Sequence, residues 1–68
     1  MKLQELLHKI EDKRIRVELL STSNAVLNKC AAHYLNMENY PEQLESEVLS
    51  IDIDRDTLII RIEYERRY

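Results

Sequence analysis

The sequence predicts an α+β fold, with one N-terminal helix packed on an antiparallel sheet of two β-hairpins and a short helix after Pro41. Residues 47–64 contain two runs in which apolar and polar side chains alternate around a polar break, which is typical of a hairpin. Residues 15–19 alternate in the same way. Residues 3–10 instead carry apolar side chains three and four positions apart, the spacing of an amphipathic helix. The helix and the half-buried strands must therefore cover one another.

The helix is expected over residues 2–11, and its apolar stripe consists of Leu3, Leu6, Leu7 and Ile10. The first strand follows, because Ile15, Val17 and Leu19 alternate with charged residues. Residues 21–24, Ser-Thr-Ser-Asn, form the next turn, since these side chains bond to nearby backbone groups.

Residues 25–35 fit two structures. As a helix, the segment has an apolar face made of Val26, Leu27, Cys30, Ala31, Tyr34 and Leu35. As a strand, it would pair with the first strand across the turn and complete a sheet large enough to be stable. The helical alternative gives the element order αβαββ.

The last hairpin follows a short helix that Pro41 can open at its first position. Each of its strands is expected to bury one apolar face against the core. The first strand presents Leu49, Ile51 and Ile53, and the second presents Leu58, Ile60, Ile62 and Tyr64. Residues 64–68 are too polar for the core.

The segments at residues 1–7, 16–19, 47–53 and 57–62 together resemble a class of small uncharacterised α+β proteins from phages and mobile elements of Gram-positive gut bacteria. In that class an amphipathic helix precedes a β-hairpin, a short leucine-bearing connection and a second hairpin that ends in an Ile-rich strand. The resemblance implies that residues 25–35 form a strand, and we adopt that interpretation. The glycine common in that strand is replaced here by alanine or cysteine. The resemblance implies no functional residue.

Length and composition indicate one small cytoplasmic domain spanning residues 1–68. A chain of this size buries only about 60% of its unfolded surface, and its single cysteine, Cys30, cannot form an internal disulfide. Oligomerisation is one way to supply the missing stability, and we predict a two-fold homodimer. No apolar run approaches the ~18 residues of a membrane span, and the N-terminus lacks the apolar region of a signal peptide.

Charge is distributed unevenly. Residues 23–54 hold six acidic residues against Lys29, while the flanks hold the other lysines and arginines. A bipolar molecule indicates self-association or a protein partner rather than nucleic acid, which requires a concentrated basic face. The candidate interaction residues are Arg14, Arg16, Glu38, Glu42, Glu45, Ile59, Arg61 and Arg66.

No motif predicts catalysis. Residues 52–63 carry acids at calcium-loop spacing, but Thr57 stands where the sharp turn of that loop needs glycine, and the chain contains no glycine. Cys30 and His33 lack the positioned base and oxyanion hole that a nucleophile needs. We therefore predict no enzyme activity, no catalytic or metal-binding residue and no cofactor.

Two functions stay open at this point. The first is an interaction or inhibitor protein that uses an exposed sheet edge or the acidic middle segment. The alternative is an oligomer that sequesters a nucleotide between subunits, with the phosphates held by Arg14, Arg16, Arg61 or Arg66. The positions of these arginines in the fold distinguish the two.

Overall fold

The computed structural model describes residues 1–65 of the chain. Its elements in order are α1 (Leu3–Lys9), β1 (Arg16–Leu20), β2 (Val26–Ala31), a 3-10 turn η1 (Ala32–Tyr34), α2 (Pro41–Leu44), β3 (Val48–Asp54) and β4 (Thr57–Ile62). The α+β prediction is confirmed, as is the short helix after Pro41. Residues 26–31 form a strand, so the helical alternative for this segment is wrong.

The sheet is four-stranded with the order β2-β1-β4-β3. Each hairpin is antiparallel as predicted, and the two hairpins join side by side through a parallel pairing of β1 with β4. In that pairing Val17 lies beside Leu58 and Leu19 beside Ile60. The central strands β1 and β4 are therefore flanked on both sides, while β2 and β3 form the two edges of the sheet.

Helix α1 begins and ends with polar contacts. The Lys2 backbone N–H donates to Glu5 Oε1 at 3.2 Å, which satisfies a donor at the helix start. At the other end the Lys13 ammonium donates to the Leu7 carbonyl, where a cation suits the negative end of the helix dipole. The helix turns Leu3 and Leu7 toward the sheet.

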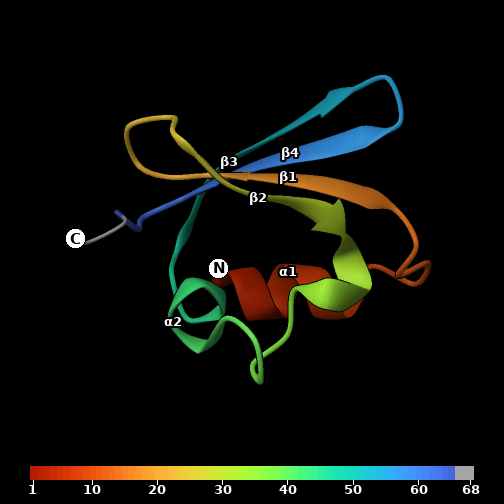
Figure 1. The fold of residues 1–68 in the computed structure, drawn as a ribbon, viewed down its shortest axis with the longest axis horizontal. Helices are drawn as coiled ribbons and strands as arrows, with labels where there is room; N and C mark the ends of the chain where they lie inside the picture. Colours follow the sequence, from red (N-terminus) through yellow and green to blue (C-terminus); the bar gives the residue numbers. More distant parts are fainter. Residues whose placement is uncertain (66–68) are drawn as a thin grey trace.

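The core lies between the helices and one face of the sheet, with both helices on the same side (Figure 1). Its buried residues are Leu3, Leu7, Val17, Leu19, Leu27, Ala32, Leu35, Leu44, Ile60 and Ile62. One polar contact links the helical layer to the sheet: Asn28 Nδ2 on β2 donates to Oε1 of the buried Gln43 on α2 at 2.6 Å.

The apolar face predicted for β3 is not buried. Leu49, Ile51 and Ile53 are 43%, 49% and 69% exposed, whereas Ile60 and Ile62 on the neighbouring strand are fully buried. The strand register shifts between Val48 and Ser50, so that Val48 and not Leu49 lies opposite the buried Ile62. For Ile51 and Ile53 the reason is the size of the helical layer. Helix α1 has seven residues and is about 10 Å long, too short to cover a four-stranded sheet whose edge strand spans about 23 Å. The β3–β4 turn extends away from the helices (Figure 1).

None of the helices in the described part of the chain is both long and apolar enough to cross a bilayer.

Candidate functional site

The exposed Ile51 and Ile53 on β3 continue the same sheet face that forms the core. Ile51 lies opposite the buried Ile60, and Ile53 lies opposite the half-buried Leu58. Directly opposed residues of an antiparallel pair share a face. The apolar surface therefore runs from the core out to the edge of the sheet. The helices cover it at the core, and at the edge it is exposed to solvent.

The outer side of β3 offers backbone groups as well as side chains. The Ile53 N–H donates to the carboxylate Oδ1 of Asp52 at 2.8 Å, so this amide does not point toward β4. Backbone groups along an antiparallel edge strand alternate between the neighbouring strand and the open side. Ile51 therefore shares the outward direction of Ile53. The Asp52 carboxylate accepts a hydrogen bond from one outward-facing amide, and such bonds protect a sheet edge from nonspecific pairing with other strands.

The N-terminal segment closes one end of this edge. The Val48 N–H donates to the Met1 carbonyl at 2.8 Å, and the Leu3 N–H donates to the Ser46 carbonyl at 2.9 Å. The Met1 amine also lies 2.9 Å from Glu47 Oε2, and this hydrogen bond raises the pKa of the amine. The open part of the edge therefore starts at residue 49 and runs to the hairpin turn.

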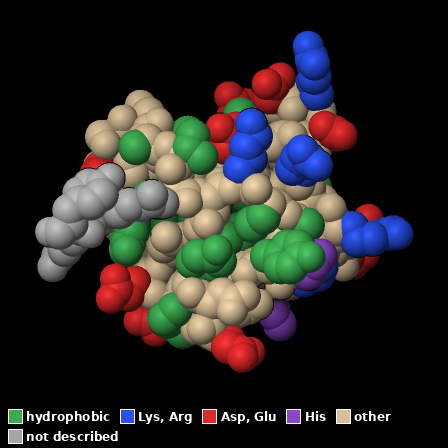
Figure 2. All heavy atoms as spheres, viewed as in Figure 1, with side chains coloured by type: hydrophobic (Ala, Val, Ile, Leu, Met, Phe, Trp, Pro, Cys, Tyr) green, Lys and Arg blue, Asp and Glu red, His purple; other side chains and the backbone are tan. Residues whose placement is uncertain are grey.

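The same hairpin is acidic. Residues 47–56 hold four acidic residues and one arginine, Arg55, a net charge of −3. Asp52 and Asp54 lie on the sheet face opposite to the exposed isoleucines, since each pairs with a β4 residue of the opposite face. In Figure 2 both acidic and basic side chains gather at the upper right, the end of the molecule where Figure 1 shows the β3–β4 turn. An apolar row and an acidic row thus flank one open edge.

The face of the sheet away from the helices holds three of the predicted interaction residues. Arg16 pairs with Thr57, Arg61 pairs with Leu20, and Ile59 lies between them on β4. Ile59 and Arg61 are half-buried, and Arg16 is exposed. Thr57 and Arg61 are four positions apart on β4, so the two arginines are separated by roughly 13 Å along the strand direction. They do not converge within one subunit.

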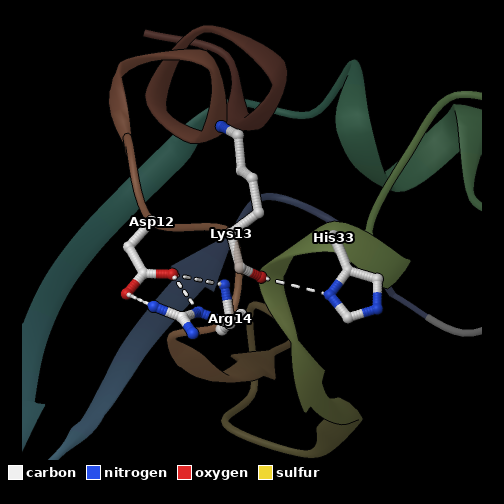
Figure 3. Close-up of polar contacts among 4 residues, drawn as sticks. All are labelled: Asp12, Lys13, Arg14 and His33. Atoms are coloured by element: carbon white, nitrogen blue, oxygen red, sulfur yellow. Dashed lines mark hydrogen bonds and ion pairs between the residues drawn. The ribbon is translucent and has the colours of Figure 1, made fainter.

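Arg14 is engaged elsewhere. Its Nε donates to Asp12 Oδ1 at 3.1 Å and its backbone N–H donates to the same oxygen at 3.0 Å (Figure 3). These bonds lower the pKa of Asp12, and both side chains are exposed in the loop before β1. Arg66 lies outside the described residues.

The acidic candidates lie on the helical side. Glu38 is exposed in the turn before α2, Glu42 lies in the first turn of α2, and Glu45 follows its last residue. Glu42 and Glu45 are three residues apart, so they share one side of this short helix. The structure therefore separates these carboxylates from the acidic row of β3.

The two residues considered for catalysis, Cys30 and His33, lie on β2 and in the η1 turn that follows it. Cys30 is half-buried opposite Val17 on the core face, and burial raises the pKa of its thiol. A protonated thiol is a poor nucleophile. His33 Nδ1 lies 3.2 Å from the Lys13 carbonyl (Figure 3), and its ring stacks near Tyr34 with centroids 4.1 Å apart. Within residues 1–65, no group of three or more His, Cys, Asp or Glu side chains could hold a metal ion.

A hollow of about 330 Å³ opens between α1 and residues 32–37. It is lined partly by apolar Leu7 and Met37 and partly by Lys13 and His33. The Lys13 ammonium already bonds to the Leu7 carbonyl, and His33 Nδ1 already contacts the Lys13 carbonyl. Lys13 and His33 thus link the loop before β1 to α1 and to η1, while His8 also lines the hollow.

No known protein family, curated protein or solved structure matches this chain. The sequence predicts an exposed sheet edge as one possible interaction surface, but it does not predict that Ile51 and Ile53 are exposed there, because alternation alone predicts their burial. A usable signal was present in the shortness of the predicted helical segments relative to the number of strands.

Proposed function

We propose that this chain is a non-catalytic interaction module that binds another protein through β3. The observation that carries the proposal is the pair Ile51 and Ile53, exposed beside outward-facing backbone groups, with Leu49 exposed next to them at the register shift between Val48 and Ser50. Edge strands with free backbone groups are templates for pairing with another chain, and partner proteins use them by adding a strand.

The exposed apolar residues support a binding role because this edge is only partly protected. Natural sheets protect an edge by covering it or by placing charged side chains on it; here Asp52 and Asp54 charge one face of β3, and the Asp52 carboxylate shields the Ile53 amide. Three large aliphatic side chains remain in water beside it. A contiguous apolar patch at an edge is typical of an interaction site.

Within a single subunit, the arginine positions do not favour a phosphate site. A phosphate site needs several arginines on one ligand. Arg14 is bonded to Asp12, and Arg16 and Arg61 lie at separate ends of the open sheet face.

Homodimerisation stays a separate prediction, and the open sheet face is where it would occur. Ile59 and Leu20 are half-buried there without a covering helix, next to Glu18 and Lys29, which pair across β1 and β2. Such a face can be self-complementary in a two-fold dimer, which would leave β3 free. Light scattering at micromolar concentration should give twice 8.2 kDa, and the monomer mass would refute the dimer.

Affinity capture from a lysate of the producing organism tests the proposed function. The wild-type chain is compared with Ile53→Lys on the open edge and with Val26→Lys, an equally polar change at an exposed position of the other edge strand. We expect the recovered amount of one protein partner to fall at least tenfold with Ile53→Lys and to stay unchanged with Val26→Lys. Equal recovery with both variants, or recovery of a nucleotide without any protein, would refute the proposal.

A further inference from the structure

We infer that the segment received by the β3 edge is an extended strand of the partner in which apolar residues alternate with lysine or arginine. This inference rests on the proposed function and names the chemistry of the partner. Three observations support it. The two faces of β3 carry different side chains, the hairpin is acidic, and a second copy of β3 cannot pair with this edge without placing acidic residues together.

The apolar half of the pattern is set by the helix side of the sheet. An added strand lies about 4.8 Å from β3 and presents every second side chain on each face. On the helix side those side chains meet Ile51 and Ile53, which are 49% and 69% exposed. Aliphatic residues at these positions would extend the core outward, because Ile51 already adjoins the buried Ile60.

The basic half of the pattern is set by the other face. There the incoming strand meets Asp52 and Asp54, and no ion pair within residues 1–65 engages either carboxylate. Opposite charges across neighbouring strands are stabilising, and like charges are destabilising. The incoming strand also replaces the Asp52 carboxylate at the Ile53 amide with a backbone carbonyl, which frees that carboxylate for a cation.

A second copy of β3 does not fit this edge. An antiparallel pairing centred on Asp52 places that residue against its own counterpart, and the two hairpins carry −3 each. An antiparallel pairing centred on Ile51 would instead place residues 54–55 of the copy beside residues 47–48. Lys2 already pairs with Glu47 there, so this position is blocked. A parallel pairing aligns the aspartates with each other. The partner strand therefore comes from a different sequence.

The N-terminal segment also limits its length. Backbone bonds from Met1 and Leu3 occupy the edge at residues 46–48, and the hairpin turn begins at Arg55. The open stretch of residues 49–54 is roughly 20 Å long, which accommodates a strand of about six residues.

Fluorescence anisotropy with synthetic heptapeptides and the full chain tests the inference. The first peptide alternates isoleucine and lysine, the second replaces every lysine with glutamate, and the third carries N-methyl groups that block ladder pairing on one side. We expect the lysine peptide to bind at least tenfold more tightly than either of the others. We also expect it to shift the amide resonances of Ile51 and Ile53.

Two matched double variants separate the edge from general acidity. Asp52→Asn with Asp54→Asn should reduce the preference for the lysine peptide to less than threefold. Glu42→Gln with Glu45→Gln removes the same charge from α2 and should leave the preference unchanged. Equal loss with both variants would show nonspecific attraction and overturn the inference, as would equal binding of the glutamate peptide.

The inference and the proposed function fail in different ways. If no peptide binds while Ile53→Lys still abolishes capture of a protein partner, the basic alternating strand is wrong and binding through β3 stands. If Ile53→Lys leaves capture unchanged, the proposed function is wrong, and the inference falls with it whatever the peptides do.

Discussion

Strands β3 and β4 are neighbours with nearly the same alternation of isoleucine and polar residues, yet they have opposite environments. On β4, Ile60 and Ile62 are fully buried, because β4 lies between β1 and β3 and under the helical layer. On β3, Ile51 and Ile53 remain about half or more exposed, because β3 is the edge and α1 does not reach it. Beyond the register shift between Val48 and Ser50, alternation thus determines which side chains share a face, and the size and position of the covering layer decide whether that face is buried.

The largest expected effect is in the covered half. Replacing Ile60 by alanine removes a fully buried side chain from the centre of the core and leaves a cavity. We expect this to lower the free energy of unfolding by about 2–5 kcal/mol, measured by urea denaturation. A loss below 1 kcal/mol would mean that the helical layer is not packed against β4.

A smaller loss is expected at the polar contact between α2 and β2. Gln43→Ala removes the acceptor that lies 2.6 Å from Asn28 Nδ2 and leaves that amide partly buried without it. An unsatisfied buried group costs about 1–3 kcal/mol, so urea denaturation should show a loss in that range. The control Glu42→Ala, on the exposed side of α2, should be nearly neutral.

The hairpin turn offers a stabilising change in the uncovered half. Arg55 has φ of 60° at the first position of the two-residue turn, in a chain without glycine. A non-glycine residue in the left-handed region destabilises the folded chain by about 1–2 kcal/mol, and glycine removes that cost. Glycine also raises the conformational entropy of the unfolded chain, which offsets part of the gain. Arg55→Gly should therefore raise the thermal midpoint, with a gain of up to about 1 kcal/mol. No gain would indicate that the turn is not strained.

The smallest expected effect is at the exposed isoleucine itself. Ile53→Ala shortens a side chain that is 69% exposed, and surface changes of this kind usually stay within about 0.5 kcal/mol. Urea denaturation beside Ile60→Ala gives the direct contrast between the two strands. A loss comparable with that of Ile60→Ala would mean that β3 is covered in solution.

Much of the fold can be predicted from local sequence patterns. The helix spacing of Leu3 and Leu7, the two hairpins and the helix-starting Pro41 are encoded within short segments, and the structure contains them. The conformation of residues 26–31 was not decided by periodicity. Pairing with β1 makes this segment a strand although its spacing also fits a helix.

The candidate site was less predictable, because it depends on relations between distant segments. The parallel pairing of β1 with β4 leaves β3 at the edge, and no local pattern specifies that order. The same holds for Met1 beside Val48, which closes one end of the edge. The alternation of residues 14–19 predicts that Arg14 and Arg16 share the non-core face of the first strand, yet β1 begins at Arg16 and Arg14 lies in the preceding loop, bonded to Asp12.

Amide hydrogen exchange of the free chain, read by NMR at each residue, tests most directly whether the β3 edge is open. The amides of Ile51 and Ile53 face away from β4, so we expect them to exchange rapidly and to gain protection when a partner strand binds. The amides of Ile60 and Ile62, on a strand flanked on both sides, should be protected throughout. Equal protection of Ile53 and Ile60 in the free chain would show that the edge is already paired and would contradict this account.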